Sequence, residues 1–283
     1  MTTGILTLSC PDRPGLVHAV SGYLMEQRVN IVESAQFGDP QTQRFFMRSR
    51  FDLLDDTAAL APVREGFAAV AAAHAMTWEL VDATTPTRTL ILVSRQGHCL
   101  NDLLFRAQAG ALPIEIPRVV SNHEDLRPLV ENAGIPYQRI PVTPETKPDA
   151  ERVLLDLVDE LAIDLVVLAR YMQVLSDDAC RALAGRAINI HHSFLPAFVG
   201  AKPYHQAYER GVKLIGATAH YVTPALDEGP IIEQDVARVD HALDPAALAQ
   251  VGHDVEAQVL ARAVKWHTER RVLLNGDRTV VVR

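Results

Sequence analysis

The sequence contains few cysteines, and their spacing indicates neither a metal site nor a disulfide framework. The three cysteines are Cys10, Cys99 and Cys180, an odd number spread over 283 residues. Structural zinc sites and disulfide-rich folds need paired or closely spaced cysteines. Free thiols are typical of a reducing compartment, so we expect a cytoplasmic protein.

Long apolar runs and an excess of positive charge are also missing. No apolar run approaches the ~20 residues that span a bilayer, and the first residues lack the basic and apolar regions of a signal peptide. The formal net charge is −8, whereas nucleic-acid surfaces need clustered positive charge. We therefore expect neither a membrane nor a nucleic-acid partner. With 48% hydrophobic residues, the chain is long enough for two globular domains.

Residues 1–84 show the pattern of a small ferredoxin-like domain. Extended apolar runs and stretches with helical spacing follow one another in the order βαββαβ, which is typical of that fold. The predicted strands are residues 4–10, 30–38, 43–53 and 76–83, and the predicted helices are 16–27 and 58–75. The segment TTPTR, residues 84–88, is the predicted linker.

Residues 85–283 form the second predicted domain, in which strands alternate with helices. The predicted strands are 89–94, 116–122, 136–142, 164–170 and 187–193, and the predicted helices are 98–110, 125–134 and 147–163. This alternation predicts an α/β fold with a doubly wound, mostly parallel sheet. After two further strands, Asp244 and Pro245 mark the start of a long helix. The pair Asn275-Gly276 then predicts a type I′ hairpin.

A strand end in the second domain carries three polar side chains, in the stretch INIHH. Side chains alternate along a strand, so Asn189 and His191 share one face. His192 faces the other way unless the strand ends before it. An amide and an imidazole on one face can polarise a carbonyl oxygen or stabilise an oxyanion. On pattern alone, hydrogen-bonded core residues are an equally good interpretation.

A metal site is the less favoured reading of the same histidines. Two adjacent histidines on a strand point to opposite faces, and His205, His220 and His241 show no ligand spacing. The glycine-poor turn SRQGHCLNDLL, from Ser94, is also a weak phosphate cradle. The loop TPALDEGP carries Asp227, which could move protons if the loop lies beside the strand end. Otherwise it is a solvated turn.

The stretch INIHHSFLPAFVGAKPYHQAYERGVKLIGATAHYVTPALDEGPIIEQ resembles the folate-dependent formyltransferase family, and the resemblance covers about residues 86–283. Asn-x-His at a strand end, SFLPAFVG after it and an Asp in the ALDEGPII loop form a highly specific combination. The resemblance implies that Asn189, His191 and Asp227 are catalytic. It also implies a folate pocket with walls formed by Met172, Gln173, Val174, Leu175, Thr223, Pro224, Ala225 and Leu226. No cofactor and no metal are implied.

Three features favour a member of the family that transfers the formyl group to water. They are the double histidine, the turn HCLNDLL in place of a glycine-rich phosphate loop, and the N-terminal domain. The implied reaction converts 10-formyltetrahydrofolate and water into tetrahydrofolate and formate, which feeds one-carbon and purine metabolism. His192 and Gly200 are expected at the water site or behind the catalytic residues. Lys202 departs from the residues expected at its position. Transfer to an amine and a non-catalytic folate or amino-acid sensor are the alternatives.

The first domain resembles an ACT domain, a small-molecule-sensing βαββαβ fold, and CPDRPGLVHAVSGYL carries the resemblance. ACT domains bind amino acids at the turn after the first strand, between paired domains. The resemblance therefore implies an effector site formed by Asp12, Arg13, Pro14, Gly15 and Asn30. It implies glycine or methionine as the effector and a homo-oligomer. The alternative is that the domain serves only assembly.

Overall fold

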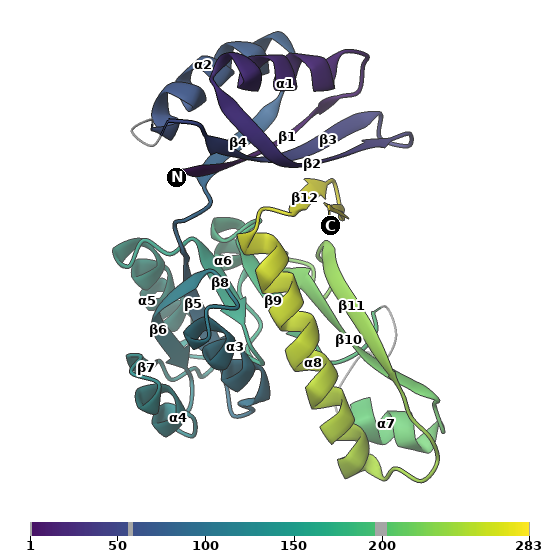
Figure 1. Cartoon of the computed structure of the whole chain (residues 1–283). Helices are drawn as coiled ribbons and strands as arrows, with labels where there is room; N and C mark the ends of the chain where they lie inside the picture. The colour runs from purple at the N-terminus through teal and green to yellow at the C-terminus, as the bar shows by residue number, and fades with distance from the viewer. Residues whose placement is uncertain (1, 56–58, 196–202, 283) are drawn as a thin grey trace. The chain divides into compact units, whose positions relative to one another are not determined.

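The computed structural model describes residues 2–55, 59–195 and 203–282, which form two compact units (Figure 1). One unit comprises Met1–Pro86 together with Glu269–Arg283, and the other is Thr87–Thr268. The structure thus differs from the predicted second domain, 85–283, at its C-terminal end. The last segment belongs to the first unit because its side chains pair with the first sheet, as described below.

The first unit is built on a four-stranded sheet in the order β2-β3-β1-β4, and all of its neighbouring strands are antiparallel. Its elements are β1 (Thr3–Pro11), α1 (Leu16–Glu26), β2 (Val29–Asp39), β3 (Arg44–Leu53), α2 (Leu60–Ala73) and β4 (Thr77–Asp82). Figure 1 shows both helices on one face of the sheet. The predicted βαββαβ order is confirmed.

The core of the first unit lies between this sheet and the two helices. Leu16, Val20 and Leu24 recur every four residues on α1 and are buried. This spacing produces one apolar stripe on a helix. The stripe packs in one cluster with Leu6 and Leu8 of β1. Hydrophobic periodicity alone therefore fixes which face of the helix meets the sheet.

The C-terminal segment pairs with β2 and β3 of the first unit. Arg271 Nη1 lies 2.8 Å from Glu33 Oε1, and Arg48 Nη1 lies 3.0 Å from Glu33 Oε2. Arg48 Nε also donates to the backbone carbonyl of Glu269 at 2.9 Å. The Arg48 side chain is only 2% exposed, so its charge depends on these partners.

The segment itself is a two-stranded hairpin, β12 (Val272–Asn275) and β13 (Arg278–Val281). The predicted type I′ turn is wrong. Asn275 pairs with Arg278 within the strands, so Gly276 and Asp277 form the turn. A type I′ turn needs a positive φ at both central residues, and only Gly276 has one, of 62°. The Asn275 amide instead donates to Asp39 Oδ2 at 2.6 Å.

The second unit contains a seven-stranded sheet in the order β11-β10-β9-β8-β5-β6-β7. Five strands are parallel, while β10 and β11 are antiparallel to their neighbours. The strands are β5 (Thr87–Val93), β6 (Ile114–Ser121), β7 (Tyr137–Arg139), β8 (Leu165–Leu168), β9 (Ala187–His191), β10 (Leu214–Tyr221) and β11 (Ile231–Arg238). The predicted doubly wound, mostly parallel sheet is confirmed.

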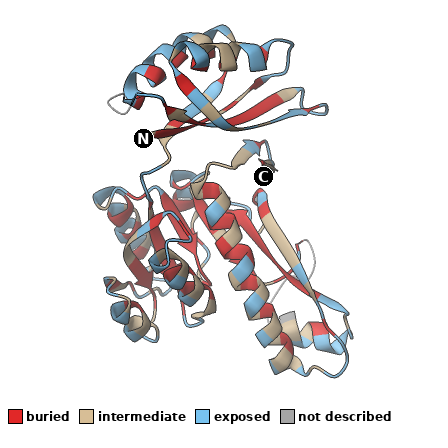
Figure 2. Cartoon of the chain, viewed as in Figure 1, coloured by how far each residue is buried: buried red, intermediate tan, exposed pale blue. Residues whose placement is uncertain are grey.

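Helices cover this sheet on both faces, so its central strands are apolar throughout. Figure 2 shows these strands as buried. Leu90 and Leu92 of β5 share a cluster with Leu154 of one helix, whereas Ile91 between them faces the other side and is 0% exposed. The helices are α3 (His98–Gln108), α4 (Arg127–Asn132), α5 (Lys147–Glu160), α6 (Asp177–Ala182), α7 (Pro203–Glu209) and α8 (Pro245–Thr268).

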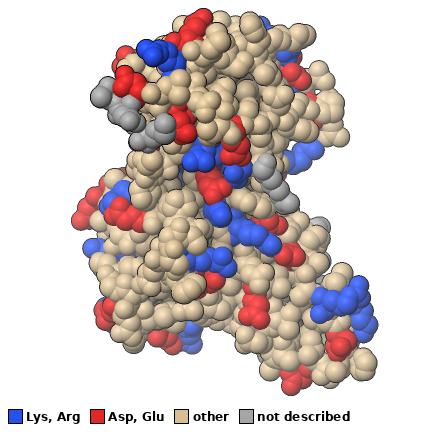
Figure 3. Space-filling model, in the orientation of Figure 1, with Lys and Arg blue, Asp and Glu red and all other residues tan. Residues whose placement is uncertain are grey.

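Three further observations concern the charged surface and the helices. On the face drawn in Figure 3, acidic and basic side chains are interspersed over both units. Among the described residues, no helix is long and apolar enough to cross a membrane. The start of α8 is capped as predicted, because the backbone N–H of Ala247 donates to Asp244 Oδ1 at 2.8 Å.

Candidate active site

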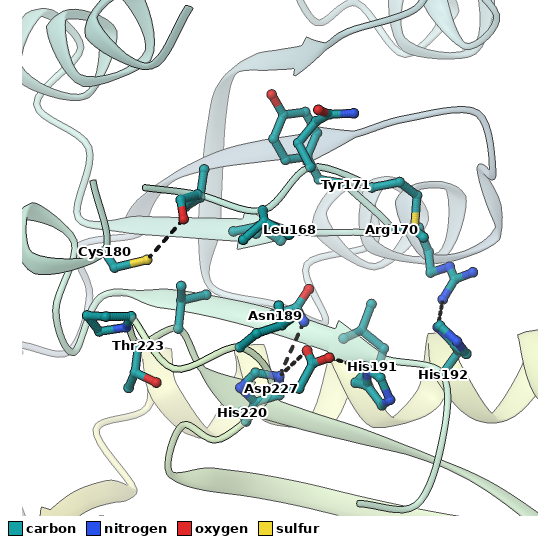
Figure 4. Close-up of a pocket in the computed structure, with 18 residues that line it drawn as sticks. Leu168, Arg170, Tyr171, Cys180, Asn189, His191, His192, His220, Thr223 and Asp227 are labelled. Carbon is teal, nitrogen blue, oxygen red and sulfur yellow. Dashed lines mark hydrogen bonds and ion pairs between the residues drawn. The ribbon is translucent and has the colours of Figure 1, made fainter. Parts of the chain in front are cut away.

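A pocket of about 330 Å³ lies at the carboxyl ends of β8 and β9, beside the loop between β10 and β11. Ligands of doubly wound folds gather at this edge of the sheet. The lining residues are Leu168, Arg170, Tyr171, Met172, Gln173, Val174, Leu175, Cys180, Asn189, Ile190, His191, His192, His220, Val222, Thr223, Pro224, Leu226 and Asp227. Figure 4 shows Asn189, His191, His220 and Asp227 gathered together in it.

The register of β9 against β10 positions the first polar side chains. Asn189 on β9 lies opposite His220 on β10, and Asn189 Nδ2 is 3.2 Å from His220 Nε2. Ile188, which faces away, is 0% exposed. The predicted sharing of one face by Asn189 and His191 is confirmed by the register, in which they lie opposite His220 and Thr218, two positions apart on β10. A β-bulge between Ala219 and His220 interrupts the pairing with β11, and such bulges redirect side chains next to sites.

Asp227 reaches the same point from the loop between β10 and β11. Its Oδ2 atom is 3.1 Å from His191 Nδ1, and its Oδ1 atom is 3.6 Å from His220 Nε2. Asp227 has a φ of 58°, in the sparsely populated left-handed region that costs of the order of 1 kcal/mol or more. The loop therefore holds this carboxylate in a strained conformation between two imidazoles.

The close approach of this loop to β10 depends on a glycine. A Cβ atom on Gly229 would overlap the backbone carbonyl of Tyr221. The next residue, Pro230, accepts a hydrogen bond from the backbone N–H of Tyr221 at 3.0 Å. Only glycine lets the two backbones meet here, and this contact brings Asp227 over the end of the strand.

The hydrogen bonds define the protonation of the site. His220 Nδ1 donates to the Tyr221 carbonyl at 2.9 Å, and its Nε2 lies between Asn189 Nδ2, at 3.2 Å, and Asp227 Oδ1, at 3.6 Å. Hydrogen bonds from His191 and then His220 lower the pKa of Asp227 well below its usual range, although burial opposes this effect. Asp227 is thus ionised at neutral pH. His191 Nε2 has no hydrogen-bond partner among the described residues.

The predicted folate walls coincide with this pocket with one exception. Every predicted wall residue except Ala225 lines the pocket, and the backbone carbonyl of Ala225 accepts a hydrogen bond from Thr223 Oγ1 at 3.0 Å. Met172, Val174 and Leu226 are 58%, 55% and 63% exposed. Exposed apolar side chains around a pocket are typical of a ligand-binding surface.

His192 lies beside His191 rather than on the opposite face. Strand β9 ends at His191, so the alternation of side chains no longer applies to the next residue. The two rings stack with centroids 4.8 Å apart. Of the other predicted residues near this site, Gly200 and Lys202 lie outside the described residues.

Sequence reasoning missed His220, which lines the pocket, and did not single out Arg170 and Tyr171, although the resemblance implies that the stretch ARYMQVLS containing them lines the folate pocket. His220 was considered only as a metal ligand, because the pairing of β10 with β9 is not evident from the sequence. Arg170 and Tyr171 directly follow a predicted strand, and that position at a carboxyl end was the available signal. Burial raises the pKa of Tyr171 to about 12, so its hydroxyl group stays protonated.

Among the described residues, one group has spacing that could suit a metal ion: His98, His253 and Glu256. Both carboxylate oxygens of Glu256 are already engaged. Oε2 accepts from His98 Nε2 at 2.7 Å, and Oε1 accepts from Tyr204 at 2.7 Å. Arg170 Nε also lies 3.4 Å from Oε2, and its positive charge opposes a cation there.

The residues predicted for an effector site are divided between two ends of the first sheet. Asp12 follows β1 and lies against Gly38, near the end of β2. Gly15, with a φ of 93°, precedes α1, and Arg13 Nη2 donates to the carbonyl of Ala73 at 2.8 Å. Asn30 is at the other end of β2, opposite Asp52. Within one chain the structure does not bring Asn30 to the turn.

Comparison with known families assigns both parts of the chain. The family described as formyl transferase matches residues 87–264. The family described as ACT domain matches residues 4–65. The pocket lies within the first of these matches.

Curated relatives match over nearly the whole chain. Formyltetrahydrofolate deformylase of Corynebacterium sp. (strain P-1) is 53% identical, and the match covers 99% of this chain and 98% of the relative. The Bacillus subtilis deformylase is 50% identical, with 98% and 93% covered.

Solved structures separate the deformylases from the transferases. Formyltetrahydrofolate deformylase from Burkholderia mallei is 51% identical with a TM-score of 0.96, and the match covers 100% of both chains. Glycinamide ribonucleotide transformylase 1 from Symbiobacterium toebii is 29% identical with a TM-score of 0.65, over 72% of this chain and 98% of that one. The chain therefore belongs to the formyl transferase family and, within it, to the formyltetrahydrofolate deformylases.

Proposed function

We propose that the protein hydrolyses 10-formyltetrahydrofolate to tetrahydrofolate and formate, which supplies one-carbon and purine metabolism. The observation that carries the proposal is the meeting of Asn189, His191 and Asp227 at the polar end of an apolar pocket. The identity to formyltetrahydrofolate deformylases along the whole chain supports water as the acceptor.

In the proposed mechanism, water attacks the formyl carbon and negative charge develops on the formyl oxygen. Asn189 and protonated His191 donate hydrogen bonds to that oxygen, and one such donor contributes about 3 kcal/mol. Asp227 orients the water and takes its proton. As the C–N bond breaks, the proton passes to N10 and formate leaves. General acid–base catalysis of this kind contributes about 100- to 10,000-fold.

The electrostatics of Asp227 fit this sequence of steps. Its pKa is low mainly because His191 donates a hydrogen bond to it. When the His191 ring is drawn toward the formyl oxygen, that hydrogen bond weakens and Asp227 becomes more basic. The carboxylate is therefore most able to accept a proton when substrate is present. No metal, nucleotide or other cofactor is part of the proposed mechanism.

Folate binding is assigned to the apolar part of the pocket. The predicted walls on both sides, residues 172–175 and 223–226, would enclose the pterin ring. A volume of about 330 Å³ is at the lower end of the range for small-molecule sites. It suits the pterin ring, while the rest of the folate extends over the exposed Met172, Val174 and Leu226 side chains.

The test is incubation of the purified protein with 10-formyltetrahydrofolate alone. We expect formate and tetrahydrofolate in equal amounts without any added acceptor. Formate release only after addition of an amine would indicate a transferase side reaction and contradict the proposal. Tight folate binding with no turnover under either condition would indicate a sensor.

We further propose that the ACT domain binds an amino-acid effector, glycine or methionine, between two copies of the chain. Asn30 and Gly38 are eight residues apart on β2, which corresponds to about 26 Å. An amino acid cannot span that distance from Asp12, beside Gly38, to Asn30. If both residues contact one effector, they come from different chains of a homo-oligomer.

The oligomer and the effector can be tested together. Light scattering with and without glycine or methionine should show at least a dimer, and calorimetry should show binding of one of the two. Asn30→Ala and Asp12→Ala should each weaken that binding. A monomer that binds the effector at full affinity would contradict the shared site.

A further inference from the structure

A buried polar network lies directly behind the pocket, on the far side of His192. Arg170 Nη1 donates to His192 Nδ1 at 2.7 Å (Figure 4). The other two guanidinium nitrogens are also engaged: Nε and Nη2 both donate to Gln96 Oε1, at 2.9 and 2.7 Å. Nε lies 3.4 Å from Glu256 Oε2 as well. Arg170 is 8% exposed and Glu256 is 0% exposed, whereas Gln96 lies at the exposed edge of the network.

This network is built from several elements and is fixed by close packing. Glu256 on α8 accepts hydrogen bonds from His98, at the start of α3, and from Tyr204 on α7. A Cβ atom on Gly252, one turn before Glu256, would overlap the Tyr204 ring. Burial raises the pKa of Glu256, but His98, Arg170 and Tyr204 outweigh it and lower the pKa to about 2. The carboxylate is therefore ionised and offsets the charge of Arg170.

The contact with Arg170 determines which nitrogen of His192 carries the hydrogen. A guanidinium can only donate hydrogen bonds, so His192 Nδ1 must be the acceptor and Nε2 must carry the hydrogen. His192 Nε2 is buried and has no hydrogen-bond partner among the described residues. His192 lines the pocket and its ring stacks on that of His191. The result is an N–H donor that is held next to the catalytic histidine.

Burial, and then the positive charge of Arg170, keep the His192 ring neutral. Burial lowers its pKa first, followed by the charges of Arg170 and His191, and the pKa is about 4 although Glu256 and Asp227 oppose the shift. At neutral pH the ring therefore cannot act as a cation. It can only offer its fixed Nε2 hydrogen.

We propose that Arg170 is a positioning residue that fixes His192 as an Nε2–H donor to the water that attacks the formyl group. This inference rests on the proposed hydrolysis. A water molecule that accepts a hydrogen bond from His192 keeps its second lone pair for the formyl carbon and its hydrogens for Asp227. No proton is transferred from His192. The donor orients the nucleophile, and misplacement of a reacting group by about 1 Å can cost about 100-fold in rate.

The first test compares two variants of His192. Gln can place an amide N–H near the position of Nε2, whereas Leu has a similar size and no donor. We expect His192→Gln to retain kcat within about 10-fold of wild type. His192→Leu should lose about 100-fold in kcat, with KM for the folate changed less than about threefold. Equal kcat values for the two variants would overturn the role of the donor.

The second test addresses Arg170 through the tautomer itself. Nitrogen-15 NMR of histidine-labelled protein should show His192 in the Nε2–H form in wild type. Arg170→Lys should keep that form and much of the activity. Arg170→Gln combined with Glu256→Gln removes both buried charges together, and should give mixed tautomers and a lower kcat. An unchanged tautomer with reduced kcat would mean that Arg170 acts in another way.

Controls distinguish a loss of the proposed His192 role from misfolding and from failure of the proposed hydrolysis. Arg106→Gln removes an arginine from a surface pair with Asp102 in the same unit and should change neither kcat nor the tautomer. Thermal unfolding and binding of unformylated tetrahydrofolate show whether each variant is folded. If wild-type protein releases no formate, the proposed function fails. If wild type hydrolyses and His192→Leu matches His192→Gln, only the inference fails.

Discussion

At the scale of single residues, the pocket places one ionised carboxylate, Asp227, beside the imidazoles of His191 and His220, with the neutral ring of His192 stacked on His191. Asp227 stays ionised because His191 and His220 donate to it, whereas burial and Arg170 keep His192 neutral. Adjacent histidines thus have different environments. Of the two, only His191 lies beside a carboxylate, with its Nδ1 atom 3.1 Å from Asp227 Oδ2.

Asp227→Asn should abolish hydrolysis while folate binding is largely retained. The amide keeps the size of the side chain but cannot accept a proton, so the loss should lie at or above the upper end of about 100- to 10,000-fold. Formate release and the dissociation constant for tetrahydrofolate measure the two effects. Glu228→Gln, in the same loop, is the matched control and should keep near-normal activity. Full activity in Asp227→Asn would remove this residue from the mechanism.

His192 should make the second unit less stable in acid. The unfolded ring has a pKa near 6.5 and the folded ring has one of about 4, so between these values the unfolded state binds more protons. Stability therefore rises with pH through this window, and acidification from pH 6.5 to 4 removes up to about 3 kcal/mol.

Urea unfolding at several pH values, followed by Trp266 fluorescence in a Trp78→Phe background, measures this effect. His192→Gln lacks the titrating ring, so its stability should fall less between pH 6.5 and 4 than that of the parent. Parallel curves for the two proteins would show that His192 does not titrate in this range.

The residues that could be predicted from the sequence are those placed by local geometry. Strand alternation brought Asn189 and His191 to one face, and the resemblance added Asp227. His220 and Arg170 could not be identified in this way. His220 reaches Asn189 only through the register of two antiparallel strands, and Arg170 reaches His192 across 22 residues. Neither of these two contacts is encoded in a short sequence motif.

At the scale of elements, the site depends on a loop that is pulled close to its own strand. Gly229 permits the contact with the Tyr221 carbonyl, and Asp227, two residues earlier, has a φ of 58°. The conformation of the loop and the position of the carboxylate are therefore coupled. The solvated turn that the sequence left open as an alternative for this loop does not fit, because Asp227 lies 3.1 Å from His191.

Gly229→Ala should reduce kcat strongly, by about 100-fold, because the loop must shift and carry Asp227 away from His191. Steady-state kinetics measure the effect. Gly276→Ala, at the tip of the C-terminal hairpin, has nothing within 4 Å of the added atom and serves as a control for a glycine with a positive φ. Its kcat should remain close to wild type. Normal kcat in Gly229→Ala would show that the loop tolerates the displacement.

Glu33→Gln should destabilise the first unit by about 2 to 3 kcal/mol. The change leaves the almost fully buried Arg48 charge without its carboxylate, and loss of one partner of a buried pair is costly. The expected loss of unfolding free energy is smaller than for a fully buried pair because Glu33 is 31% exposed. Urea unfolding followed by Trp78 fluorescence in a Trp266→Phe background reports on this unit.

The matched control for Glu33 is Glu115→Gln. Glu115 pairs with Arg88 at 2.7 Å, but the two side chains are 52% and 36% exposed. Its loss should cost less than about 1 kcal/mol, read from Trp266 fluorescence because Glu115 lies in the second unit. A similar small loss in Glu33→Gln would mean that the contacts of the hairpin do not hold the segment in place.

The order of the elements was predictable because it depends on hydrophobic periodicity, as the stripe on α1 illustrates. The details of turns were not. Asn275 matched the composition of a type I′ turn, yet its side chain bonds to Asp39 across 236 residues. That long-range contact outweighs the local preference and moves the turn forward by one residue.

At the scale of the whole molecule, the sequence suggested two domains in succession, with a linker at residues 84–88. The order of predicted elements changes from βαββαβ to alternating strands and helices, and this change predicted the division. The return of the last residues to the first unit was not visible. It depends on pairs such as Arg271 with Glu33, 238 positions apart, and composition carries no information about them.

The return of Glu269–Arg283 to the first unit means that the catalytic unit is, in topological terms, an insertion. The polypeptide leaves the ACT unit at residue 86 and re-enters it at residue 269, so the two units are joined by two tethers. A single protease cut in either tether would not release them from one another. A premature stop codon after residue 268 would leave the catalytic unit whole. It would remove residues Glu269–Arg283 from the ACT unit.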